Sequence, residues 1–245
     1  MLARENGSGS KAKWTLNDSG KRVPVIVSLP EKIEPGVTSQ ALISFVDVLP
    51  TMVEIAGGKT PKAPGSIDGE SFMAVLQGRS KNHHRYVFGA HTNRGIHAGK
   101  AFPLRSVRDE QHKLILNLCP ACVNQNTFTH HRDWQPRRDG LFAQWLELAK
   151  NDESQQSRLN NFIRRPEIEL FDLKADPWEQ NNLAGDPELL PVIATLRAEL
   201  ESWMLQQGDK GLAAEIEIPL LDVNQQTGPV YPQKNNWLPA QVESN

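Results

Sequence analysis

Two short strand-like segments separated by a polar turn constrain the fold of this 245-residue chain more than any other feature. Residues 105–108 and 112–117 flank Asp109-Glu110-Gln111, and a later segment, 168–173, alternates apolar with acidic residues. Alternation with a period of two is typical of strands that bury one face. The sequence therefore predicts three antiparallel strands.

Helical patterns surround these strands. Asp47 can cap a helix over residues 48–56 that tolerates Pro50 in its first turn, and residues 140–150 carry apolar side chains at helical spacing. Asp186-Pro187-Glu188 opens a longer helix that Gly208 ends. One face of that helix is an apolar stripe typical of core packing: Leu189, Ile193, Leu196, Leu200 and Trp203. We expect an α+β fold, a small antiparallel sheet flanked by helices.

Two weaker patterns precede the sheet. Residues 23–29, closed by Pro30, are apolar and β-branched and predict a buried strand, and residues 41–45 predict a second short one. The stretch 71–78 predicts a small helix. From Gly211 onward the chain is polar and predicts a surface tail.

Composition excludes several classes of protein. The formal charge is 27 − 29 = −2, which disfavours a basic nucleic-acid binder. The longest apolar stretch, residues 41–56, contains Ser44, Asp47, Pro50 and Glu54, so no transmembrane helix is expected. The first ten residues lack the apolar core of a secretory signal, and the compartment stays open.

A succession of short motifs resembles the carboxy-terminal part of the sulfatase family, the alkaline-phosphatase-like hydrolases of sulfate esters. The resemblance covers most of residues 5–207, and HTNRG at 91–95 is similar to the heparan N-sulfatase branch. The motifs are KWTLNDSGKRVP (13–24), VDVLPT (46–51), DGES (68–71), RSVR (105–108), KLI (113–115), ELFDL (169–173) and DPWEQNNLA (176–184).

The resemblance implies a domain organisation. Residues 1–22 resemble a loop at the end of the sulfatase catalytic domain, 23–210 the carboxy-terminal region, and 211–245 form a tail. In the family this region packs against a larger α/β catalytic domain. We therefore expect exposed apolar surface around 23–29 and 48–56 and, through it, self-association.

Two features of the family are missing. The formylglycine nucleophile arises in a Cys/Ser-x-Pro/Ala-Ser-Arg motif, but Cys119-Pro120-Ala121-Cys122 has no following Ser-Arg. The first pair of metal-binding Asp residues is also absent. We therefore expect a truncated sulfatase that alone hydrolyses no aryl sulfate. The alternatives are an accessory protein that binds sulfated sugars without cleaving them, and a catalytic half encoded upstream.

The resemblance also assigns candidate site residues. Glu5 and Asn6 resemble the second metal motif, where the family holds calcium, although the family has Asp in place of Glu5. Lys13 occupies the position of a catalytic lysine that faces the substrate's sulfate. His91, Asn93 and Arg94 form a polar cluster suited to a sulfate or carboxylate on a sugar. The ordinary alternative for each is a solvated loop residue.

Other polar pairs carry less chemistry. Cys119 and Cys122, followed by His130-His131, invite a zinc interpretation, but the spacing does not fit usual zinc sites, and free or bridged thiols are the alternative. Three pairs of basic residues are interpreted as solvated or salt-bridged on the surface: His83-His84, Arg137-Arg138 and Arg164-Arg165. The expected partners are a sulfated small molecule or glycan, with neither nucleic acid nor membrane.

Overall fold

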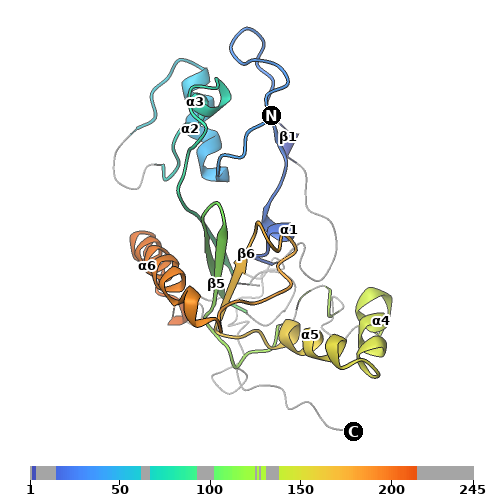
Figure 1. Ribbon diagram of the computed structural model, residues 1–245. Helices are drawn as coiled ribbons and strands as arrows, with labels where there is room; N and C mark the ends of the chain where they lie inside the picture. The colour runs from blue at the N-terminus through green and yellow to red at the C-terminus, as the bar shows by residue number, and fades with distance from the viewer. Residues whose placement is uncertain are drawn as a thin grey trace, which may run out of the picture. The chain divides into compact units, whose positions relative to one another are not determined.

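The computed structural model describes residues 2–3, 15–61, 67–92, 102–124, 126, 128–130 and 138–213 (Figure 1). They divide into two compact units. The first consists mainly of residues 23–87, and the second includes the segment that ends at Arg22, residues 88–107 and the described residues from His112 onward. The predicted boundaries at residues 22 and 210 stay predictions.

The first unit contains little regular structure. A two-stranded antiparallel ladder joins β1 (Leu2–Ala3) to β2 (Val25–Ile26), and a 3₁₀ turn, η1 (Phe45–Asp47), leads into α2 (Val48–Ile55). The short α3 (Met73–Leu76) follows, and an isolated bridge pairs Leu42 with His84. The helix predicted over 48–56 is confirmed, but the carboxylate of Asp47 does not cap it.

The strand predicted over 23–29 is wrong in length and in burial. Only Val25 and Ile26 form a strand, and their exposed fractions are 39% and 62%. Pro24 and Pro30 bracket this segment, and proline cannot donate to a ladder. The predicted second strand over 41–45 is reduced to the bridge at Leu42.

The first unit also presents apolar side chains to solvent, as the sequence led us to expect. These large residues lie on β2, on η1 and α2, and in the loop between them: Val25, Ile26, Val37, Phe45, Val46, Leu49 and Met52. A unit that covers its own core does not usually leave so many apolar groups exposed together.

The second unit is built on the predicted antiparallel sheet. Its four strands, in the order β3-β4-β5-β6, are β3 (Val87–His91), β4 (Leu104–Arg108), β5 (His112–Asn117) and β6 (Ile168–Asp172). Antiparallel register places Lys113 opposite Phe171 and Leu116 opposite Ile168. The α+β class predicted from the sequence is confirmed.

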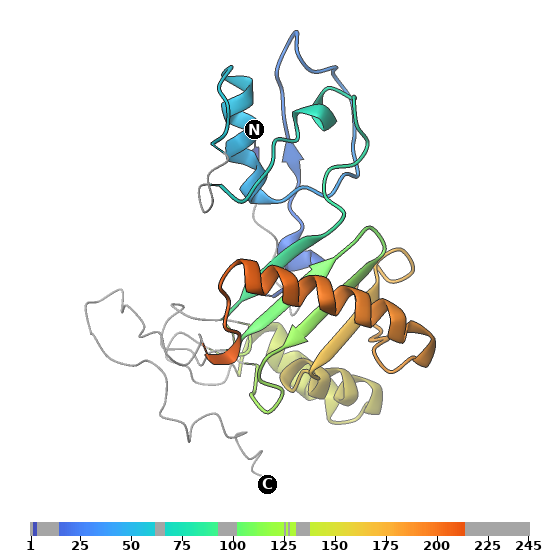
Figure 2. The ribbon, with the colours of Figure 1, turned by 90° about the vertical axis from the view of Figure 1, so that its left-hand side faces the viewer.

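Helix α6 (Leu190–Gln206) lies along one face of this sheet (Figure 2). The preceding 3₁₀ turn, η2 (Pro187–Leu189), begins at Asp186, whose side chain accepts a hydrogen bond from the Glu188 amide at 2.9 Å. From the predicted stripe, Ile193, Leu196 and Leu200 are buried. The Trp203 ring stacks on Phe88 of β3 at 5.1 Å between centroids. The capping residues and the helical spacing of the stripe thus predicted this helix, and three of the five stripe residues are buried.

The opposite side of the sheet carries α4 (Gly140–Ala149) and α5 (Glu153–Ile163), which pack against each other (Figures 1 and 2). The side chain of Asp152 caps α5 by accepting from the amides of Ser154 and Gln155. A separate apolar cluster joins the sheet to the segments before β4 and after β5: Leu16, Phe102, Leu104, Ile115, Cys119, Cys122 and Phe171. No helix among the described residues has the length and apolarity needed to span a bilayer.

Candidate functional site

The structure describes one of the six predicted site residues. His91 is the last residue of β3, and its neighbour Thr92 is also described. The other predicted residues lie outside the described part of the chain: Glu5, Asn6, Lys13, Asn93 and Arg94. The geometry of the candidate site is therefore built outward from His91.

His91 lies close to two buried arginines, Arg105 of β4 and Arg165, which follows α5. Burial above all, and then the positive charges of Arg165 and Arg105, together lower the pKa of the His91 imidazole from 6.5 to about 4. The ring is therefore neutral near pH 7. It offers one N–H donor and one acceptor nitrogen rather than a positive charge.

Arg105 is held rigidly beside the end of β3. Its Nε and Nη2 donate to the two carboxylate oxygens of Asp209 at 2.5 and 3.1 Å, and its Nη1 donates to the Leu104 carbonyl at 3.0 Å. A further contact of 3.5 Å joins Nη1 to the His91 carbonyl. Burial acts to raise the pKa of Asp209, but the hydrogen bonds from Arg105 and the Gly211 amide outweigh it and hold that pKa below its ordinary value.

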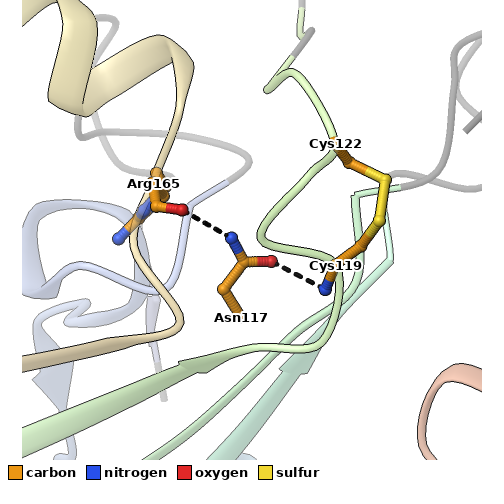
Figure 3. The surroundings of a disulfide bond; sticks show 4 residues. All are labelled: Asn117, Cys119, Cys122 and Arg165. Atoms are coloured by element: carbon orange, nitrogen blue, oxygen red, sulfur yellow. Dashed lines mark hydrogen bonds between the residues drawn. A yellow bond between two sulfur atoms is a disulfide. The ribbon is translucent and has the colours of Figure 1, made fainter. Parts of the chain in front are cut away.

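Arg165 is fixed by a second buried ion pair. Its Nε and Nη2 donate to one oxygen of Glu169 at 2.8 and 2.5 Å. Its backbone carbonyl accepts from the Asn117 side chain at 2.9 Å, and the other end of that amide accepts from the Cys119 backbone at 3.0 Å (Figure 3). Asn117 thus ties the segment carrying Arg165 to the loop after β5.

That loop contains a disulfide between Cys119 and Cys122 (Figure 3). The bridged alternative for these cysteines is therefore correct, and their zinc interpretation is wrong because both thiols are consumed. Both residues are buried in the apolar cluster that also contains Phe102 and Phe171. The bridge therefore closes the same loop that Asn117 connects to the backbone of Arg165.

The described cluster is balanced in charge. Two guanidinium groups face two carboxylates, those of Asp209 and Glu169, while His91 is neutral near pH 7. The described residues of this cluster therefore offer an anion oriented hydrogen-bond donors but no excess of positive charge.

Sequence reasoning missed parts of this arrangement. Arg165 was interpreted as a surface residue, but its side chain is only 5% exposed, because Glu169 four residues later supplies a buried partner. That i, i+4 pairing of opposite charges is visible in the sequence and was the available signal. Asp209 is distant in sequence from Arg105, and no local pattern joins them. The sequence predicted His83-His84 to be solvated or salt-bridged on the surface; both rings do contact a carboxylate, but it is the buried one of Asp47.

We expect the His91 imidazole to titrate near pH 4 in the folded protein, and an NMR titration of the ring resonances, assigned with His91→Gln, measures it. Because the folded pKa lies below the unfolded value, the unfolded state binds more protons between these pH values. The contribution of His91 to stability is thus complete above pH 6.5 and is lost as the pH falls toward about 4. A midpoint at the ordinary value would contradict the buried placement.

Comparison with known proteins finds sulfatase relatives over most of the chain. Residues 9–125 match the family described as N-sulphoglucosamine sulphohydrolase, C-terminal. The chain is 36% identical over 213 residues to an ulvan-active sulfatase of Formosa agariphila, across 87% of this chain and 39% of that protein. It is 26% identical over 214 residues to human N-sulphoglucosamine sulphohydrolase, across 80% of this chain and 39% of the relative. The chain therefore spans about two fifths of the length of these relatives.

A solved structure shares the fold. It is a protein in complex with its substrate D-glucosamine-2-N,6-O-disulfate, with a TM-score of 0.51 and 23% identity across 77% of this chain and 29% of that chain.

Proposed function

Because this chain belongs to the sulfatase family, we propose that it forms the carboxy-terminal part of an enzyme that hydrolyses sulfate ester or sulfamate groups. The observation that carries this proposal is the match to an ulvan-active sulfatase over 87% of the chain. That match extends well beyond any single motif. The nucleophile is assigned to residues outside these 245, because they contain no Cys/Ser-x-Pro/Ala-Ser-Arg motif.

The proposed substrate class is a sulfated sugar. Its support is the nature of the relatives: one acts on ulvan, and another is named for N-sulphoglucosamine. A neutral His91 agrees with this class, since a sugar offers hydroxyl groups that pair with one donor and one acceptor. We assign Asn93 and Arg94, which follow His91 in sequence, to contacts with the same sugar.

Lys13 is proposed as the catalytic lysine that stabilises charge on the sulfate. A compact ammonium suits an anion whose oxygens gain charge in the transition state. Glu5 and Asn6 are proposed as calcium ligands, because carboxylate and amide oxygens are the donors that hard cations prefer. When bound, calcium would offset the negative charge of the sulfate oxygens.

The exposed apolar residues of the first unit support a packing role. We propose that Phe45, Val46, Leu49 and Met52 pack against the larger catalytic part that the sulfatase relatives possess. Each is at least half exposed in this chain, and burial of such side chains favours association. Self-association through the same surface is the proposed behaviour of the chain in isolation.

A chimeric enzyme tests the proposed function. Residues 5–213 would replace the matching segment of the Formosa agariphila ulvan-active sulfatase, and sulfate release from a sulfated sugar would be measured with calcium present. We expect turnover, and a loss of about 10²–10³-fold in kcat for Lys13→Ala, as when one charge-stabilising donor is removed. Lys150→Ala, on an exposed helix end, is the matched control and should leave kcat unchanged.

The outcomes separate the alternatives. A folded chimera without turnover that still binds the sulfated sugar, with binding lost in Arg94→Ala, would favour the accessory binding protein. Turnover that does not depend on Lys13 would contradict the assigned catalytic role. The isolated 245-residue chain should release no sulfate.

A further inference from the structure

We propose that Asp47, His83 and His84 form a binding site for zinc or a similar first-row divalent cation. All three residues lie in the first unit, and their ligand atoms lie within 4.8 Å of one another. None of these three residues belongs to the predicted set of His91, Glu5 and Asn6.

Asp47 provides a rigid, buried carboxylate. Its side chain is fully inaccessible, and its Oδ2 accepts from the Ser44 amide at 2.7 Å while Oδ1 accepts from the Glu70 amide at 3.0 Å. These two amides come from the turn before α2 and from the loop before α3. Outer-shell hydrogen bonds of this kind orient a ligating carboxylate and reduce the entropy lost on binding a metal.

Two imidazole nitrogens converge on this carboxylate. The Nε2 atom of His84 lies 2.9 Å from both oxygens of Asp47, and the Nε2 atom of His83 lies 3.5 Å from Oδ2. The ring centroids of the two histidines are 4.1 Å apart. The backbone amide of His84 donates a hydrogen bond to the Leu42 carbonyl, and the ring of His83 packs edge-on against Phe72.

His83 supplies the observation that points to a ligand. Its side chain is 9% exposed, and its Nε2 atom has no hydrogen-bond partner among the described residues. An unpaired buried polar atom costs roughly 1–3 kcal/mol. The hydrogen bond between Asp47 and His84 does not involve that atom, whereas a cation bound by all three residues would give it a partner.

The donor set and the spacing favour zinc. Two imidazole nitrogens and one carboxylate oxygen make up a common zinc ligand set, whereas calcium and magnesium prefer oxygen donors. Ligands about 2.0–2.1 Å from a tetrahedral ion lie roughly 3.3 Å from each other. The contacts of 2.9 and 3.5 Å to Asp47 lie on either side of that value. His84 is 25% exposed, which leaves the fourth position to water.

A zinc titration of the metal-depleted 245-residue chain tests this site. We expect one Zn²⁺ per chain by isothermal titration calorimetry and a higher melting temperature with Zn²⁺ present. His83→Gln should weaken binding by more than about tenfold, since even outer-shell changes at metal sites cost 10–100-fold. His112→Gln, at the start of β5, is the matched control and should bind as the wild type does.

Two results would overturn the proposal: equal Zn²⁺ affinity in His83→Gln and His112→Gln, or no binding by the wild-type chain at micromolar Zn²⁺. If His83→Gln fails to fold, the Co²⁺ complex of the wild-type chain decides. The visible spectrum of four-coordinate Co²⁺ would support the site, and that of six-coordinate Co²⁺ would overturn it.

Discussion

Replacing Lys113 by methionine is expected to lower the free energy of unfolding by about 3–5 kcal/mol, the usual cost of breaking a buried ion pair from one side. The ammonium of Lys113 is 1% exposed and contacts the carboxylates of both Asp18 and Glu179, the latter at 3.0 Å. Its removal leaves two carboxylates without their cation, and that of Glu179 is almost completely buried. Urea denaturation followed by circular dichroism measures the change.

The backbone around this ion pair adds to the expected effect. Glu179 has a φ of +54°, in the left-handed region that favours glycine, and its Oε2 accepts from the Asp18 amide at 2.6 Å. Without Lys113, the hydrogen bond that holds this strained residue must also hold a carboxylate that has lost the Lys113 ammonium. Adding Glu179→Gln to Lys113→Met should recover part of the loss, because it removes the buried negative charge at residue 179.

Lys150→Met is the matched control for the same chemical change. Lys150 pairs with Glu147 at 2.7 Å, but the two side chains are 64% and 70% exposed. Exposed pairs typically contribute about 0.2–1 kcal/mol. Comparable losses for Lys113→Met and Lys150→Met would contradict the buried triad.

Replacing Leu200 by alanine is the second large change, with an expected loss of about 2–5 kcal/mol from lost burial and the cavity left behind. Leu200 is fully buried in α6, the helix that contacts β5 of the sheet. Leu205→Ala is the control on the same helix, since Leu205 is 81% exposed. Both changes alter helix propensity alike, so their difference in thermal or urea denaturation reports packing alone. Equal effects would mean that α6 does not cover the sheet.

Local patterns predicted the second unit better than the first. The strands β4, β5 and β6 were predicted from their short apolar runs and alternation, and the helix α6 from its apolar stripe at helical spacing. The strands are nevertheless buried along consecutive residues, because helices lie on both sides of the sheet. Helix α5 was not predicted, since its sequence ESQQSRLNNFI has only three apolar residues, all near its end. Tertiary packing against α4 supplies what its own pattern lacks.

The polar sites depended on contacts that no local pattern encodes. His83 and His84 face Asp47 from about 36 positions away in the chain, so their spacing could not reveal the cluster. Arg105 meets Asp209 across 104 positions. The polar side chains of His91, Asn93 and Arg94 predicted a binding site. Only the fold shows that two arginines lie near His91 and that its imidazole is neutral near pH 7.

Gly69 shows how narrowly one backbone position can limit sequence variation. A Cβ atom at this position would lie 2.1 Å from the Val46 carbonyl oxygen and 2.7 Å from the Asp47 amide nitrogen. Neither atom belongs to a flexible side chain that could move aside. Gly185, by contrast, has open space around its Cβ position. Substitutions during evolution can therefore be accommodated at Gly185 but not at Gly69. The absence of a Cβ atom at Gly69 lets the chain pass close to Val46, so that the neighbouring Glu70 amide donates to Asp47.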